Sequence, residues 1–124
     1  MNKELFEKWF FNLKTAWETK NPQLAADICS ENLLWYETPF DEPLKTKGEV
    51  LDEWQTVSKQ EDISVEYQIL AVEGQTAITQ WSAKFIRIPS GEKVEMEGIF
   101  KVRLNNEGLC EEFHQWYNYK SAGK

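Results

Sequence analysis

The second half of the chain alternates apolar and polar residues in four runs, at 63–72, 76–88, 93–104 and 109–119. Alternation with a period of two is typical of strands that bury one face, so each run is predicted to be a β-strand. The stretches VEGQ, PSGE and NNEG separate the runs, and the glycine in each favours a tight turn. The runs therefore predict neighbouring antiparallel strands, which need strong twist or bulges because they exceed the usual length of ~5–6 residues.

The first third of the chain has helical spacing instead. Apolar residues from Phe6 to Trp17 recur at intervals of three and four, which predicts one amphipathic helix. Asn21 and Pro22 fit the N-cap and first position of a short second helix that ends near Cys29. The stretch LLWYE that follows is too short for a helix, and its aromatic residues suit a strand.

A third helix is predicted after the loop TPFDEPLK. Thr46 and Glu49 have the spacing of a capping box, and apolar residues from Val50 to Val57 follow at helical intervals. Helices at the front and long strands behind predict an α+β domain, with the helices on one face of a curved sheet and a cavity between the two layers.

Size and charge limit what such a domain can do. The 124 residues fit one domain, predicted to cover 1–120 with a frayed tail at 121–124. A net charge of −7 without a Lys/Arg cluster argues against nucleic acid or an anionic membrane as the partner. No apolar run approaches the ~20 residues of a membrane span, and the N-terminus does not read as a signal peptide. We therefore expect a cytoplasmic protein.

Two cysteines and one histidine give little basis for a metal site. Cys29 and Cys110 lack CxxC spacing and have no cluster of histidines near them, since the chain contains a single histidine. We expect two buried, reduced thiols, and neither a metal nor a cofactor.

Three local motifs resemble the nuclear transport factor 2-like (NTF2-like) superfamily, in its SnoaL-like and ketosteroid isomerase-like branch. They are the strand end NLLWYETPF, the helix start TKGEVLDEW, and the last strand NNEGLCEEFHQWYNY. The resemblance implies a cone-shaped fold, three N-terminal helices on a curved and mainly antiparallel sheet, around an apolar pocket. It also implies a homodimer formed through the outer surface of the sheet. The fold hosts isomerases, cyclases, dehydratases and non-catalytic binding domains, so it does not by itself fix the activity.

The residues of steroid isomerases are not matched. At the position of their aspartate base this chain has Thr38, and Phe100 aligns with their acidic oxyanion-hole donor. Their tyrosine partner has no counterpart, because the first helix contains no tyrosine. Steroid-type isomerisation is therefore not expected.

The resemblance also predicts which residues face the pocket. The family's register directs Leu34, Tyr36 and Thr38 inward, whereas a slip by one residue would turn Trp35, Glu37, His114 and Trp116 inward instead. With the family's register, the predicted ligand contacts are Tyr36, Thr38, Trp54, Met96, Phe100, Phe113, Gln115 and Tyr117.

Glu37 and His114 are the candidate catalytic residues. Glu37 needs either a bulge or the slipped register to point inward, and His114 needs the slipped register. A glutamate among tryptophans would have a raised pKa, and an imidazole beside it would be a suitable partner. In the alternative interpretation both side chains lie on the surface or at a dimer edge. Asp41 and Glu42 lie in the loop at the expected pocket rim.

Two functions remain open at this stage. The first is a domain of unassigned activity that binds a small hydrophobic molecule in an aromatic pocket. The alternative is a cofactor-free isomerase, cyclase or dehydratase with Glu37 or His114 as general base. An ionisable side chain that points into the cavity would favour the enzyme.

Overall fold

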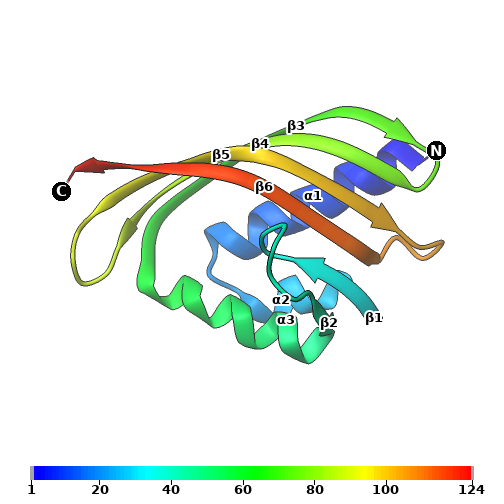
Figure 1. Cartoon of the computed structure of the whole chain (residues 1–124), viewed down its shortest axis with the longest axis horizontal. Coiled ribbons are helices and arrows are strands. Elements are labelled where there is room, and N and C mark those ends of the chain that lie inside the picture. The colour runs from blue at the N-terminus through cyan, green and yellow to red at the C-terminus, as the bar shows by residue number, and fades with distance from the viewer. Residues whose placement is uncertain (1, 124) are drawn as a thin grey trace.

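The computed structural model describes residues 2–123 and has an α+β fold (Figure 1). Two helices lead into the first two strands, a third helix continues as a 3₁₀ helix, η1, and four long strands complete the chain. The elements are α1 (Asn2–Glu18), α2 (Pro22–Asp27), β1 (Cys29–Tyr36), β2 (Leu44–Thr46), α3 (Lys47–Glu53), η1 (Trp54–Lys59), β3 (Gln60–Glu73), β4 (Thr76–Arg87), β5 (Lys93–Leu104) and β6 (Cys110–Gly123).

All six strands form one curved sheet in the order β2-β1-β6-β5-β4-β3. The neighbours from β3 to β6 are antiparallel, as the glycine turns predicted, while β1 runs parallel to β6. Figure 1 shows the long strands arching over α1, with α2 and α3 below them on the same side. The predicted α+β architecture is confirmed.

The sequence signals for helix starts act as expected. The side-chain oxygen of Asn21 accepts a hydrogen bond from the Leu24 N–H at 3.1 Å and caps α2. Thr46 Oγ1 accepts from the Glu49 N–H at 3.1 Å, while Glu49 Oε1 accepts from the backbone N–H of Lys45. The capping box at α3 therefore reaches one residue further back than the standard pattern.

Aromatic rings fill the space between α1 and the sheet. Phe6, Trp9 and Phe10 of α1 are each at most 2% exposed. Trp9 Nε1 donates to the Ile28 carbonyl oxygen at 2.8 Å, which ties α1 to the start of β1. The helix is thus fixed by a buried hydrogen bond as well as by apolar burial.

Two of the differences from the sequence prediction lie at β2 and at the end of β6. The strand β2 lies in a segment predicted to be loop, where three residues are too few to show a period. At the other end β6 runs on to Gly123, which pairs with Lys93, so 121–123 belong to the strand and not to a frayed tail. Lys124 lies outside the described residues. In the described part of the chain, none of the helices has the length and hydropathy needed to cross a membrane.

Candidate functional site

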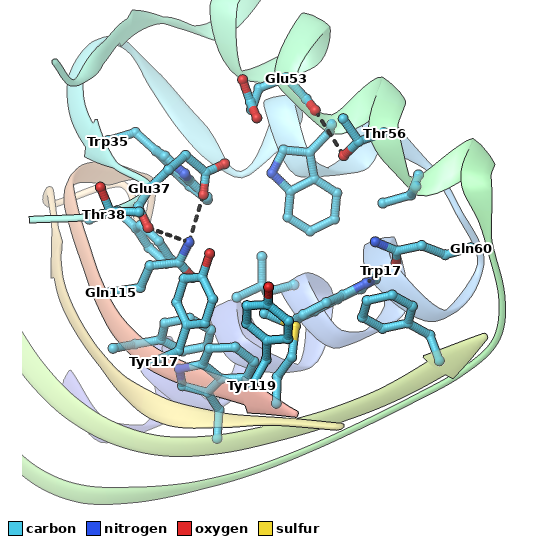
Figure 2. A pocket seen from close by; sticks show the side chains of 18 of the residues that line it. Trp17, Trp35, Glu37, Thr38, Glu53, Thr56, Gln60, Gln115, Tyr117 and Tyr119 are labelled. Carbon is cyan, nitrogen blue, oxygen red and sulfur yellow. Dashed lines mark hydrogen bonds between the residues drawn. The ribbon is translucent and has the colours of Figure 1, made fainter. Parts of the chain in front are cut away.

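A cavity of about 420 Å³ lies between the concave face of the sheet and the helices (Figure 2). Its walls come from α1, from the junction of α3 and η1, and from the inward side chains of β1, β4, β5 and β6. Nine aromatic rings line it: Trp17, Trp35, Trp54, Trp81, Phe85, Phe100, Phe113, Tyr117 and Tyr119. A volume of this size suits a small organic ligand.

The pairing of β1 with β6 decides which residues of β1 face the cavity. Trp35 lies opposite Phe113, and the two rings stack at 3.8 Å between centroids on the cavity side. Tyr36 lies opposite His114, and these rings stack at 4.6 Å on the outer face of the sheet. Residues that are paired across two strands point to the same face, so Trp35 points inward with Phe113. Glu37 follows directly after the end of β1 and lines the cavity.

The expected inward direction of Tyr36 is therefore wrong. The alternation could not show this, because the four residues from Leu33 to Tyr36 are all apolar and both faces look buried. The strand β1 has the orientation of the slipped register, with Trp35 inward, whereas β6 has that of the family's register. Gln115 and Tyr117 line the cavity, whereas His114 and Trp116 face outward.

His114 lies outside the cavity with partners of its own. Its Nε2 is 3.0 Å from Glu112 Oε2, and its ring is stacked between Tyr36 and Trp116. It cannot exchange a proton with a ligand held in the cavity, because the sheet separates the two.

Glu37 is held in place by Gln115. Gln115 Nε2 donates to Glu37 Oε2 at 2.7 Å and to the Glu37 backbone oxygen at 2.8 Å. Figure 2 shows the other carboxyl oxygen of Glu37 facing the open part of the pocket. The side chain is thus oriented by one oxygen and accessible to a ligand through the other.

The surroundings raise the pKa of Glu37 from 4.5 to about 7. Burial contributes most, the Glu53 carboxylate adds repulsion, and Asp41 adds a smaller repulsion. The Trp35 indole works against them and lowers the pKa, although its Nε1 does not reach hydrogen-bond geometry with any partner among the described residues. At neutral pH both protonation states of Glu37 are therefore populated.

Tyr117 shares the electrostatic environment of Glu37. Burial raises the pKa of the Tyr117 hydroxyl, and the charges of Glu37 and Asp41 raise it further, with Arg87 acting in the opposite direction. The hydroxyl therefore stays protonated at neutral pH and is available as a hydrogen-bond donor. Thr38 also lines the cavity, because β1 ends at Tyr36 and the strand alternation stops there; its Oγ1 donates to Asp41 Oδ2 at 2.8 Å.

The other six predicted contacts also line the cavity: Trp54, Met96, Phe100, Phe113, Gln115 and Tyr117. Sequence reasoning missed Glu53, Tyr119 and Arg87. Tyr119 could have been found by continuing the alternation of β6 by two residues from Tyr117. Glu53 had no such signal, because it lies where α3 passes into η1 and the helical spacing changes.

Metal ligands do not converge in this cavity. Within residues 2–123, no group of three His, Cys, Asp or Glu side chains lies close enough together to hold a metal ion. The carboxylates of Glu37, Asp41 and Glu53 are instead spread around the mouth and wall of the pocket.

A model of the SnoaL-like domain family matches residues 10–113 of the chain. No curated protein sequence matches it significantly.

Several solved structures share the fold at low sequence identity. SalBIII, described as an epoxide hydrolase/cyclase-like enzyme in pyran ring formation in the polyether salinomycin, superposes with a TM-score of 0.80 at 12% identity, over 97% of this chain and 95% of SalBIII. A computationally designed 17-OHP binder gives 0.78 at 16% identity, over 94% of this chain and 96% of the binder. A hexachlorocyclohexane dehydrochlorinase, LinA type 2, gives 0.83 at 9% identity, over 98% of this chain and 88% of LinA. At these identities the likeness establishes the fold alone.

Proposed function

The chain belongs to the SnoaL-like domain family, and from that premise we propose that its aromatic pocket binds a small, largely apolar molecule and that Glu37 transfers a proton to or from it. The reaction would be a cofactor-independent isomerisation, cyclisation or elimination. The observation that carries this proposal is the Glu37 carboxyl group, which faces the cavity with a pKa of about 7.

A carboxyl group with a pKa near the working pH suits both directions of proton transfer. At neutral pH a large fraction of the Glu37 side chains is deprotonated and can accept a proton from the ligand. Once protonated, Glu37 is a weak acid, so it returns the proton only to a basic site in the reacting molecule. Gln115 fixes Oε2, so the proton would be exchanged at Oε1, the oxygen that faces the open pocket. Orientation of the base in this way lowers the entropic cost of reaching the transition state.

Charge that develops on an oxygen of the substrate needs a hydrogen-bond donor. Tyr117 is a candidate, because its hydroxyl stays protonated and lies on the same wall as Gln115, two residues further along β6. The aromatic walls would exclude water and strengthen both interactions. Two of the solved structures that share this fold are named for catalysis of related kinds, a cyclase-like enzyme and a dehydrochlorinase, which supports the proposal by analogy.

The test compares wild-type protein with Glu37→Gln on a metabolite extract in D₂O. A proton-transfer enzyme exchanges or consumes particular compounds, and mass spectrometry would detect new masses or deuterium incorporation that the variant fails to produce. The control Glu112→Gln removes a carboxylate from the outer face and should behave as wild type. Identical profiles for wild type and Glu37→Gln would overturn the proposed catalytic role.

A non-catalytic binding domain is the second candidate. The observation in its favour is the wall itself, in which aromatic and aliphatic side chains outnumber the polar groups. In that case Glu37 and Tyr117 would only orient the ligand. The result expected is a ligand recovered unchanged by native mass spectrometry, with weaker binding in Glu37→Gln.

We also propose that two copies associate through the outer face of the sheet, and that the protein acts in the cytoplasm. Leu34 and Trp116 are 38% and 42% exposed on that face, next to His114. A large exposed ring beside an exposed leucine favours a protein contact. Sedimentation should give a dimer for wild type and a monomer for Trp116→Glu; a monomeric wild type at high micromolar concentration would contradict the proposal.

A further inference from the structure

Three carboxylates surround one end of the pocket with little positive charge to balance them. Glu37 faces the cavity, and Asp41 and Glu53 are exposed at its mouth. Both raise the pKa of Glu37, so their fields reach the interior of the pocket. Among the described residues that line the cavity, Arg87 is the single cationic side chain.

Arg87 does not neutralise this end of the pocket. Its Nε forms an ion pair with Glu92 Oε1 at 3.1 Å, and its guanidinium carbon lies 5.5 Å from the centre of the Phe85 ring. Arg87 lowers the pKa of Tyr117, but its effect is the smallest among the groups that shift this pKa. It is not among the groups that shift the pKa of Glu37. An anionic ligand would therefore meet repulsion at the mouth, whereas a cationic one would relieve the repulsion among the three carboxylates.

The aromatic rings of the same pocket also suit a positive charge. Trp17, Trp54, Tyr117 and Tyr119 line it together with the carboxylates, and ring faces attract ammonium groups when water is excluded. Figure 2 shows Tyr117 and Tyr119 on the sheet wall, Trp17 on the helix side and Glu53 at the mouth, around one open space. Among the described residues these carboxylates do not form a group that could hold a metal ion, which favours a positive charge carried by a larger organic ligand.

Trp35 adds a buried hydrogen-bond donor to the cavity wall beside Glu37. It lines the cavity beside Glu37 and is 1% exposed, yet its Nε1 has no hydrogen-bond partner among the described residues. A buried donor without a partner costs free energy, which an acceptor atom on a bound ligand would recover.

We propose that the pocket selects an organic cation, a protonated amine or quaternary ammonium group on an apolar body, with the positive group between Glu37, Asp41 and Glu53. The apolar body lies deeper, against Trp81, Phe100 and Met96. This names the ligand class for the pocket of the proposed function and rests on that pocket being a ligand site. It does not depend on whether a reaction follows binding.

The test uses two isosteric probes, phenyltrimethylammonium and tert-butylbenzene, which differ in charge and hardly in shape. Titration followed by the fluorescence of the pocket tryptophans should give a dissociation constant about tenfold lower for the cation at low salt. Benzenesulfonate should bind more weakly than either. The preference for the cation should decrease about fivefold in the double variant Asp41→Asn/Glu53→Gln, with binding of tert-butylbenzene unchanged.

Glu66→Gln is the matched control, because it removes a carboxylate from an exposed site on β3 that does not line this cavity. It should leave the preference for the cation as in wild type. Equal affinities for the cation and its neutral isostere in wild type would overturn the inference and leave the proposed function standing. Absence of binding by either probe at millimolar concentration would overturn both.

The charge of phenyltrimethylammonium does not change with pH, so the pH dependence of its binding reports on the protein. Affinity should rise between pH 6 and 8 as Glu37 loses its proton, in a field set by Glu53, Asp41, Trp35, Gln115 and Tyr117. In Glu37→Gln this rise should disappear. A pH-independent affinity in wild type would contradict a cation placed next to Glu37.

Discussion

Replacement of Glu37 by glutamine should stabilise the folded protein at alkaline pH and leave its stability nearly unchanged at acidic pH. The reason is that folding raises the pKa of this carboxyl group from 4.5 to about 7. Between these two values the unfolded chain has lost the proton while the folded chain still holds it. Stability due to this group is therefore fully present below about pH 4.5 and is lost as the pH rises through about 7.

The size of the effect follows from the two pKa values. Their difference corresponds to about 3 kcal/mol of unfolding free energy, since each pKa unit is about 1.4 kcal/mol at 25 °C. Glutamine has no charge to lose, and its side-chain oxygen can still accept the hydrogen bond from Gln115 Nε2. We expect Glu37→Gln to be more stable than wild type by about 1–3 kcal/mol at pH 8.5, because relaxation around the charged group reduces the full value.

The measurement is urea denaturation followed by tryptophan fluorescence at pH 5 and pH 8.5, on wild type, Glu37→Gln and the control Glu66→Gln. The quantity compared is the change in unfolding free energy between the two pH values. If wild type and Glu37→Gln show the same change, the carboxyl group does not have a raised pKa in the folded state. The assignment of Glu37 as a group that titrates near neutral pH would then be wrong.

Three further predictions concern the framework around the pocket. Gly98→Ala should destabilise the fold by about 2 kcal/mol or more in urea denaturation, because a Cβ there would collide with the carbonyl oxygen of Trp116 in the adjacent strand. Cys29 and Cys110 are fully buried, and burial raises the pKa of the Cys110 thiol, so a thiol reagent such as DTNB should react with them only after unfolding. Asn21→Ala should cost about 1 kcal/mol through loss of the α2 cap, measured by thermal or urea denaturation.

Each of these has a control or an outcome that would contradict it. Gly48→Ala is the control for Gly98→Ala, because the nearest atom that a Cβ at Gly48 would meet is Thr46 Oγ1 at 3.8 Å. Equal stability of the two alanine variants would show that β5 and β6 are not as close at Gly98 as described. Fast reaction of either thiol in buffer would mean that β1 and β6 separate readily at the pair Cys29–Cys110. The control for Asn21→Ala is Asn21→Asp, which can still cap α2 and should retain most of the stability of the wild-type protein.

The sheet could be predicted from the sequence because its strands bury one face. In β4, for example, residues from Ala77 to Phe85 are buried at every second position, which is the pattern that alternation reports. The helix starts could be predicted for a similar reason, since capping is a local interaction within three residues. The strand β2 could not, because three residues carry no period and its pairing with β1 is set by tertiary structure.

The pocket was harder to predict because a pocket depends on pairings between distant segments. On β6, the alternation predicts Phe113, Gln115 and Tyr117 on one face, and these three residues line the cavity. Glu53 has no pattern around it and approaches Glu37 only when α3 is placed over β1. Its effect on the pKa of Glu37 is a property of the fold and has no local signature.

The direction of Glu37 shows most clearly what local sequence leaves undecided. Both faces of the strand from Leu33 to Tyr36 look apolar, so alternation allowed either Tyr36 or Glu37 to point inward. The parallel pairing of Trp35 with Phe113 removes the ambiguity, because Phe113 has an independently fixed direction. Resemblance at single positions does not settle the question either, because threonine at position 38 stands where steroid isomerases have their aspartate base. The carboxylate is instead one residue earlier, where the end of β1 allows both Glu37 and Thr38 to line the cavity. A missing family residue is therefore weak evidence against acid–base chemistry unless the pairing of the strand that carries it is known.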